Sequence, residues 1–372
     1  MKLILRNSLI ITGLLTVLYF GCKPKTQQPE TTEPVKAETI IIIDMAGRVV
    51  EVPADIDSVF SRCPMGTILM YTLNPEKIAG LSWKPTEYEK EFLTKDYCSL
   101  PVLSGWFATN EGNVEEIIRT APDIMFSSTE NPEKNTAAKE QADKLQSLLN
   151  IPVVIISAGI ENIPAIYRFA GKLINEEERA EVLAAYTEDM LAEVKGIADT
   201  IPEEKKVGIY YAEGVEGLHT DPSGSRHSEL IDFIGAVNVA DVEMIIGVGG
   251  MGRTQVSPEQ LLAWNPNMII ACHDQGFANN AGTYTAVLSD SRFETLDAVS
   301  GGKVFEIPYI PFNVTDRPPS VNRIIGVKWL ANLVYPEYYN YNMEKEFREF
   351  YKLFYNIDLT DEQLTIILAN AR

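Results

Sequence analysis

The chain has 372 residues, and its 32 Lys and Arg residues stand against 52 Asp and Glu residues, a formal net charge of −20. Nucleic-acid binding needs a basic surface, so this charge balance argues strongly against it. Residues 38–372 are long enough for two domains of roughly 150 residues each.

The first 21 residues predict an export signal. Lys2 and Arg6 precede an apolar stretch of 13 residues, from 8 to 20, which is shorter than the roughly 17–25 residues that span a bilayer as a helix. The following Gly21-Cys22 resembles a bacterial lipoprotein cleavage site, so we expect Cys22 to be acylated. The alternative is a plain secretory peptide with an incidental cysteine. Residues 22–37 hold three prolines and no aromatic residue, which predicts a lipidated, unfolded tether.

Two segments with the same pattern lie 144 residues apart, at 113–126 and 257–270. NVEEIIRTAPDIMF and SPEQLLAWNPNMII each begin with a capping residue, and Glu116 or Gln260 follows three residues later, the spacing of a capping box. A proline ends each short helix, and the apolar run after it is typical of a strand buried on both faces of a parallel sheet. Each half of the chain is therefore predicted to contain a helix that leads into a central strand.

Further strands are predicted at 59–61, 153–156, 207–211 and 304–307, alternating with helical stretches. Between the halves, apolar residues at steps of three and four from Glu176 predict one amphipathic helix of about 24 residues. The alternative is a helix packed within a single larger domain. We predict an α/β fold of two Rossmann-like lobes, with mainly parallel sheets, joined by one long helix. The expected parts are an N-terminal lobe (38–160), connecting helices (161–200), a C-terminal lobe (201–338) and a C-terminal helical segment (339–372).

Ligands of open α/β sheets bind beyond the carboxyl ends of the strands. The most informative stretch there is the turn 221–227, which precedes a predicted helix at 228–234. Gly224 and Ser225 predict free backbone N–H groups at the helix start, and Arg226 and His227 add positive charge; a plain loop with a surface arginine is the alternative. The other candidate ligand-binding residues at strand ends or in nearby loops are Cys63, Trp106, Ser128, His273, Asp274, Asn313 and Arg317.

Three histidines are few for a bare metal site, which usually draws several histidines and carboxylates. Direct capture of a divalent ion is therefore disfavoured, although His273 could ligate a chelated metal or serve as a structural histidine. Haem binding through a cysteine or histidine is a weaker alternative, and no cofactor is predicted. After Cys22 three cysteines remain, which allows at most one internal disulfide, and Cys63–Cys98 is the favoured pair.

No enzyme signature is present. The chain has no G-x-S-x-G elbow, P-loop or H-E-x-x-H motif, and the glycine-rich stretch 247–252 does not open a helix directly after a strand. We therefore do not predict an enzyme.

Several stretches, in this order and spacing, resemble the iron-chelate and cobalamin class of periplasmic binding proteins. They are IIIIDMAGRVVEVP (40–53), LNPEKIAGL (73–81), the two repeated segments and HSELIDFIGAVNVA (227–240). The resemblance covers residues 39 to about 338 and implies the class III fold, with a solute held between the lobes and delivered to the permease and ATPase of an ABC importer. It also implies that Glu115 and Glu259 dock into arginine-lined pockets of the permease. The alternative to docking is that each glutamate only complements the dipole of its helix.

The expected protein is thus a monomeric lipoprotein, anchored on the periplasmic side of the bacterial envelope, that binds a ferric siderophore or a similar anionic chelate. A molybdate or tungstate oxyanion comes second, because residues 312–336 resemble that branch, and cobalamin comes third. The rival classes are a periplasmic enzyme such as a chelatase on the same fold and a pure scaffold.

Overall fold

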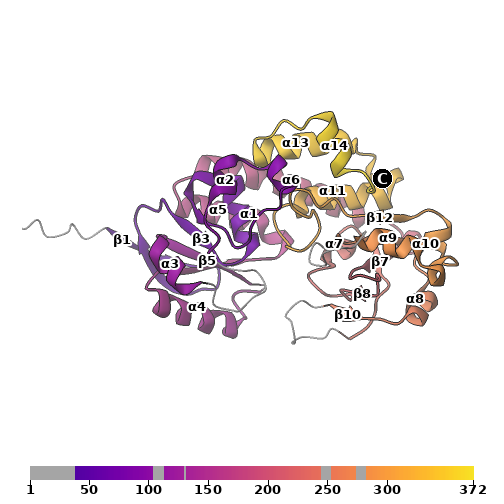
Figure 1. Cartoon of the computed structure of the whole chain (residues 1–372), viewed down its shortest axis with the longest axis horizontal. Helices are drawn as coiled ribbons and strands as arrows, with labels where there is room; N and C mark the ends of the chain where they lie inside the picture. The colour runs from indigo at the N-terminus through magenta and orange to yellow at the C-terminus, as the bar shows by residue number, and fades with distance from the viewer. Residues whose placement is uncertain (1–37, 104–112, 130, 244–252, 274–281) are drawn as a thin grey trace, which may run out of the picture. The chain divides into compact units, whose positions relative to one another are not determined.

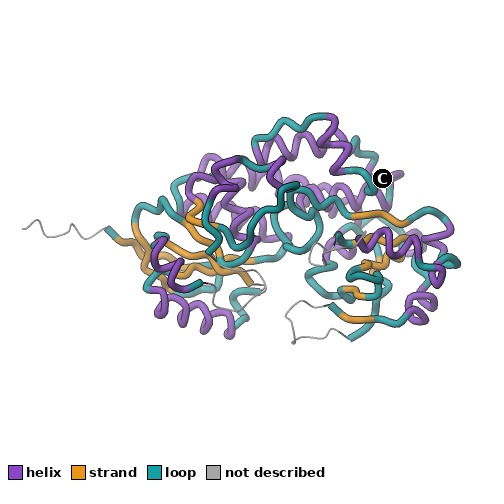
Figure 2. Tube along the Cα trace, viewed as in Figure 1, coloured by secondary structure: helices purple, strands orange, loops and turns teal. Residues whose placement is uncertain are grey.

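The computed structural model describes residues 38–103, 113–129, 131–243, 253–273 and 282–372 (Figure 1). Residues 38–372 form one compact unit, within which the strands gather into two separate four-stranded sheets with helices beside them (Figure 2). Every strand pair inside these two sheets is parallel. In the described part of the chain, none of the helices combines the length and the apolar character that crossing a bilayer requires.

The first sheet has the strand order β4-β3-β5-β6, and an antiparallel hairpin precedes it. The hairpin turns at Gly47, whose φ is +78°, and covers the edge of β6: Met45 N donates to Ile155 O, and Ile155 N donates to the carboxylate of Asp44. The elements of this lobe are β1 (Thr39–Ile43), β2 (Val49–Pro53), β3 (Val59–Ser61), α1 (Pro64–Leu73), β4 (Ile78–Gly80), α2 (Lys95–Ser99), α3 (Val114–Thr120), β5 (Ile124–Thr129), α4 (Thr136–Leu149) and β6 (Val153–Ser157).

The second sheet has the order β12-β11-β7-β9. Two further strands of this half of the chain, β8 and β10, pair antiparallel with each other outside that sheet. The elements of this lobe are β7 (Gly208–Ala212), β8 (His219–Thr220), α7 (Glu229–Phe233), β9 (Val237–Asn238), β10 (Thr254–Gln255), α8 (Pro258–Trp264), β11 (Met268–Ala271), α9 (Gly282–Ser289), α10 (Asp297–Ser300) and β12 (Val304–Glu306).

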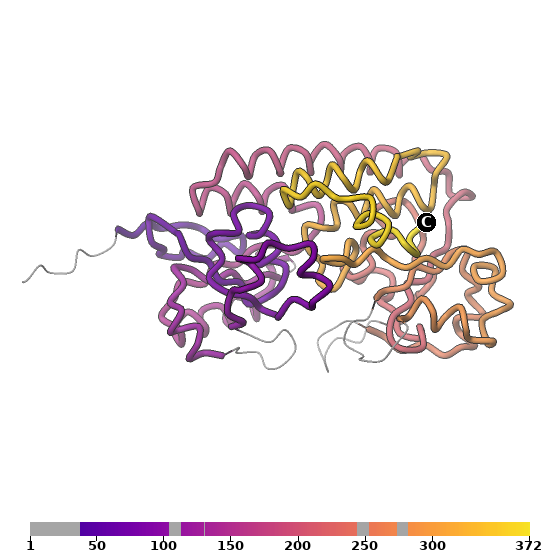
Figure 3. The backbone as a smooth tube through the Cα atoms, turned by 45° about the horizontal axis from the view of Figure 1, so that its top comes forward, coloured from indigo at the N-terminus to yellow at the C-terminus, as the bar shows by residue number. Residues whose placement is uncertain are grey.

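Helices alone connect the two sheets and complete the chain. The connection consists of α5 (Ile163–Leu173) and α6 (Glu177–Ala198), and the end of the chain consists of α11 (Arg323–Val334), α12 (Pro336–Tyr339), α13 (Met343–Tyr355) and α14 (Asp361–Ile367). Helix α13 runs beside α6 (Figure 3), where Tyr186 meets Phe354 edge to face. The guanidinium of Arg179 on α6 donates to Thr72 O at the end of α1 and to Leu353 O near the end of α13, so one side chain satisfies carbonyls of two helix ends.

The structure confirms the predicted fold class and most of the predicted elements. The four further strands appear within one or two residues of their expected ends, and the predicted 24-residue helix is α6, of 22 residues. Asn113 caps α3 through the N–H of Glu116, and Ser257 forms a complete capping box with Gln260. The short strands β4, β8, β9 and β10 were not predicted. Strands of two or three residues carry little periodic signal, and the equally short β3 and β12 were found because they lie in apolar runs.

One apolar core crosses from the first lobe to the last helices. The same group of packed buried residues includes Leu69 of α1, Tyr167 of α5, Leu183 of α6, Trp329 of α11 and Phe350 of α13. The lobes are therefore joined by shared packing as well as by the chain.

Replacing Gly326 with alanine is expected to destabilise the protein by about 1–3 kcal/mol, because an added Cβ would overlap the carbonyl oxygen of Val314 in the loop that precedes α11. The matched control is Gly196→Ala on α6, where a Cβ would meet nothing within 4 Å. That change should stabilise the protein by about 0.5–1 kcal/mol, since alanine has the higher helix propensity. Urea denaturation measures both, and equal stability of the two variants would contradict this packing.

Candidate ligand-binding site

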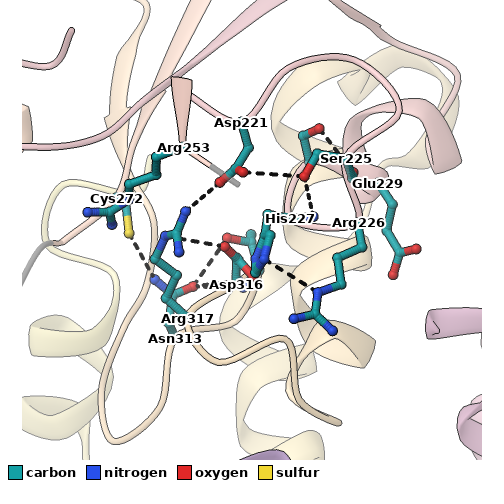
Figure 4. A network of polar contacts seen from close by, with 12 residues as sticks. Asp221, Ser225, Arg226, His227, Glu229, Arg253, Cys272, Asn313, Asp316 and Arg317 are labelled. Carbon is teal, nitrogen blue, oxygen red and sulfur yellow. Dashed lines mark hydrogen bonds and ion pairs between the residues drawn. The ribbon is translucent and has the colours of Figure 1, made fainter. Parts of the chain in front are cut away.

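Polar side chains converge beyond the carboxyl ends of the strands of the second lobe. Glu213 directly follows β7, Asp221 directly follows β8, and Cys272 directly follows β11. The loop between β12 and α11 brings Asn313, Asp316 and Arg317 to the same place (Figure 4). Because parallel strands end at one edge of a sheet, residues that are up to about a hundred positions apart meet here.

Arg317 is the centre of this group. Its Nη2 donates to Asp221 Oδ2 at 2.5 Å and to Glu213 Oε2 at 3.2 Å, and its Nε donates to Glu213 Oε1. Arg253 Nε also donates to Glu213 Oε1, at 3.1 Å. The side chains of Glu213 and Asp221 are fully buried, and that of Arg317 is 8% exposed. Paired with Arg317 and Arg253, the carboxylate of Glu213 escapes much of the cost of burial.

The pKa values of Asp221 and Asp316 shift in opposite directions because different charges lie beside the two carboxyl groups. Burial and the nearby charge of Glu213 together raise the pKa of Asp221 to about 9, against the lowering effect of Arg317. Burial also acts to raise the pKa of Asp316, but the charges of His227 and Arg317 outweigh it and hold that pKa well below its ordinary value. Asp221 is therefore protonated at neutral pH, whereas Asp316 is ionised.

His227 and Asp316 form the second pair of the site. His227 Nδ1 lies 2.7 Å from Asp316 Oδ1, and Arg226 Nε donates to His227 Nε2 at 3.4 Å. The other carboxylate oxygen, Asp316 Oδ2, is buried and has no hydrogen-bond partner in the described part of the chain, although Arg317 Nε lies 3.5 Å away.

Arg323, on α11, links the 313–317 loop to the 225–229 turn. This guanidinium, on a side chain only 1% exposed, donates to Thr315 O at 2.8 Å and also to Arg226 O and Glu229 Oε1. Glu229 Oε1 additionally accepts the N–H of Ile160, at 3.2 Å, from the first lobe. The positions of the 313–317 loop and the 225–229 turn are thus linked to each other and to the neighbouring lobe.

The turn before α7 differs from its prediction in one respect. The N–H of Ser225 donates to Pro222 O at 3.0 Å, that of His227 to Ser225 Oγ at 3.2 Å, and that of Ser228 to Ser225 O at 3.1 Å. The expectation of a free N–H group is therefore wrong for Ser225, because the turn itself supplies an acceptor for it. Helix α7 has only five residues, so the helix dipole adds little. Arg226 carries the positive charge of this turn.

His273 lies in a different environment. Its Nδ1 is 2.9 Å from Glu306 Oε1, and its ring stacks on Tyr309 with centroids 3.6 Å apart. It shares none of these contacts with the group around Arg317. Asp274, its predicted neighbour in the site, lies outside the described residues, as do Trp106, the stretch 247–252 and Cys22.

In the first lobe, Cys63, just beyond the end of β3, meets Ser128, the residue before β5 ends at Thr129, with Sγ and Oγ 2.6 Å apart. Cys63, Cys98 and Cys272 are all free thiols, so the favoured Cys63–Cys98 pairing is wrong. In the second lobe, Asn313 Nδ2 donates to Cys272 Sγ at 3.7 Å, and Asn313 Oδ1 accepts the N–H groups of Thr315 and Asp316. Asn313 therefore shapes the loop that carries Asp316 and Arg317.

Five residues of the site escaped the sequence prediction: Glu213, Glu229, Arg253, Asp316 and Arg323. Two of them had a usable signal. Glu213 stands just past the predicted strand at 207–211, and Asp316 lies between the two predicted residues Asn313 and Arg317. Charged residues in those positions are candidates by the strand-end rule alone.

Two parallel-sheet lobes, joined by helices and carrying polar groups at their strand ends, define the class III type of solute-binding protein. The family model for periplasmic binding proteins matches residues 83–311, more than half of the chain, and the chain belongs to this family. No curated protein matches it.

Solved structures agree with this assignment. An ABC transporter solute-binding protein from Sulfurospirillum deleyianum is 30% identical, with a TM-score of 0.78 over 88% of this chain and 99% of that one. Molybdate-bound MolA of Haemophilus influenzae is 20% identical, with a TM-score of 0.65 over 86% of this chain and 99% of that one. Helicobacter pylori CeuE in a Ni-His complex is 14% identical, with a TM-score of 0.65 over 88% and 99%. The last two show the shared fold alone.

These matches establish an extracytoplasmic solute-binding protein of an ABC transporter, as the resemblance in sequence implied. The family and its neighbours serve transport rather than catalysis.

Proposed function

We propose that this protein captures an anionic metal complex at the strand ends of the second lobe and delivers it to an ABC importer. The observation that carries the proposal is the charge of the site. With Asp221 protonated, four guanidinium groups meet three ionised carboxylates, a surplus of one positive charge. The guanidinium groups belong to Arg226, Arg253, Arg317 and Arg323, and the carboxylates to Glu213, Glu229 and Asp316.

Local positive charge is what an acidic protein needs in order to hold an anion. Removal of the export signal, with Lys2 and Arg6, takes the formal net charge from −20 to −22. Such a chain repels anions at long range, so affinity has to come from contacts at short range. A ferric siderophore or similar chelate is the first candidate ligand. A molybdate or tungstate oxyanion is the second, favoured by the fold shared with molybdate-bound MolA, and cobalamin is the third.

We further propose that an acylated Cys22 and the tether 22–37 keep the protein at the outer face of a membrane. Delivery would use Glu115 on α3 and Glu259 on α8 to dock onto the permease. Both glutamates are exposed, and each is in the first turn of its helix, at the corresponding position of the repeated segments. A carboxylate in this position can pair bidentately with an arginine of the partner.

Calorimetry on the wild type and on Arg226→Ala tests the ligand's charge. The ligands are a ferric chelate, molybdate and cobalamin, after native mass spectrometry with metal analysis has shown what the protein carries from its host. Loss of one charge-assisted contact should weaken binding of the anion by about 10–150-fold. Unchanged affinity in Arg226→Ala would make the turn an ordinary loop, and turnover of the ligand would favour the chelatase alternative.

A further inference from the structure

Three atoms of the kind that bind metal ions lie together at the centre of the site. One oxygen each from Asp221 and Asp316 and one imidazole nitrogen from His227 all lie within 4.8 Å of one another. Both carboxylates are fully buried, whereas the His227 side chain is 11% exposed. They come from two segments of the chain: the connection between β8 and α7 carries Asp221 and His227, and the loop before α11 carries Asp316. The imidazole is thus the member of the group that solvent reaches.

Two buried polar atoms beside this group point to a missing partner. Asp316 Oδ2 has no hydrogen bond in the described part of the chain, and the same is true of the hydroxyl of Tyr211 on β7. Asp316 is among the charged groups that act on the Tyr211 hydroxyl. Buried polar atoms are almost always satisfied, and exceptions are often explained by an ion or a water molecule that belongs there. An ion bound to Asp316 would supply a partner for at least one of these two unbonded atoms.

Arg317 would keep a carboxylate partner if Asp221 bound such an ion. At present its Nη2 bonds Asp221, but the same guanidinium also bonds both oxygens of Glu213. If Asp221 turned toward a metal ion, Arg317 would keep its bidentate pairing with Glu213. The guanidinium can therefore release Asp221, which loses its proton on binding a metal ion, without leaving a buried charge unpaired.

We propose that Asp221, His227 and Asp316 bind the metal centre of the captured complex directly. One imidazole and two carboxylates suit a divalent first-row transition ion, and three protein ligands leave coordination positions open for a chelator. Arg226, whose Nε already contacts His227, is placed to pair with the chelator's anionic groups. This inference rests on the proposed function and narrows its ligand class. A coordinatively saturated oxyanion such as molybdate has no open position for these side chains.

The test uses Ni²⁺ and Mn²⁺ alone, and each with citrate, titrated into the purified chain by calorimetry in a non-coordinating buffer. The variant is His227→Gln, which removes the ligand that solvent reaches and leaves both buried carboxylates in place. The control is His219→Gln, on neighbouring β8 and outside the group. We expect one ion per wild-type chain, at least tenfold weaker binding in His227→Gln, and affinity within about twofold of wild type in the control, since even outer partners of metal ligands contribute 10–100-fold.

A spectroscopic reading separates ligation from a general loss of structure. Bound Co²⁺ should show visible absorption that changes in His227→Gln while the far-ultraviolet circular dichroism of the variant stays that of wild type. Equal metal affinity in His227→Gln and wild type would overturn the inference, as would failure of the wild type to bind any of these ions with or without citrate. The proposed function is judged separately: binding of molybdate or cobalamin with unchanged affinity in His227→Gln would leave it standing while the inference falls.

Discussion

Arg317→Met is expected to lower the free energy of unfolding by about 3–5 kcal/mol, because it removes a cation from the buried carboxylate of Glu213 and a hydrogen-bond donor from Asp221. Arg253 would still contact Glu213, but Glu213 would lose its two bonds to Arg317, whereas the protonated Asp221 would lose a donor rather than a balancing charge. Methionine fills much of the same volume, and the loss therefore measures the charge pairing rather than a cavity. Urea denaturation followed by circular dichroism gives the value.

The matched control is Arg292→Met. Arg292 also pairs with two carboxylates, Asp290 and Glu216, but its side chain is 46% exposed. Solvent screens such pairs, so the expected loss is below about 1 kcal/mol. Adding Asp221→Asn to Arg317→Met should change the stability little, because Asp221 is already uncharged at neutral pH. Equal losses in Arg317→Met and Arg292→Met would show that the buried network is no more important than a surface pair.

The double variant Glu115→Arg/Glu259→Arg should reduce uptake by cells at least tenfold and leave the ligand affinity of the purified protein unchanged. Two arginines would face the arginine-lined pockets that we expect on the permease, and like charges placed together cost several kcal/mol. Both positions are exposed and distant in sequence from the loops that carry Arg226 and Arg317, so the ligand site should not change. Radiolabelled uptake and calorimetry, run on the same pair of proteins, separate the two effects.

The control for this experiment is Glu133→Arg/Glu294→Arg, which makes the same change of net charge at one exposed site in each half of the chain. Uptake with this control should stay near the wild-type rate. If both double variants transport equally well, the two repeated glutamates only complement their helix dipoles. If both lose uptake equally, overall charge rather than docking explains the result.

Local chemistry made much of the fold predictable. The caps Asn113 and Ser257 and the apolar runs that follow them are short-range signals, and each produced the expected helix and strand. The strand-end rule then located the turn at Arg226 and the loop at Arg317 without any knowledge of the sheet order. The stretches that carried the prediction are those in which neighbouring residues determine the backbone.

The contacts inside the site could not be predicted in the same way. Glu213 and Arg317 are 104 residues apart, and nothing near either residue indicates that they pair. The N–H group of Ser225 was expected to be free, but the carbonyl oxygen of Pro222 accepts it. The hydroxyl of Ser225 in turn accepts the N–H of His227, and short polar side chains often compete for backbone groups in this manner. The pairing of charges in a buried cluster depends on sheet order, which the sequence pattern leaves open.

Because α1, α5, α6, α11 and α13 share one apolar core, neither half of the chain is expected to fold when it is expressed without the other. A fragment ending after α6 would expose the faces of α1 and α6 that α13 and α11 cover, and a fragment starting at β7 would leave α11 without α6. Exchange of a whole lobe would therefore expose these packed faces. New solute specificity would arise more readily from substitutions in the strand-end loops, where the side chain of Arg226 can change without removing the contact that Arg323 of α11 makes with the backbone of this turn.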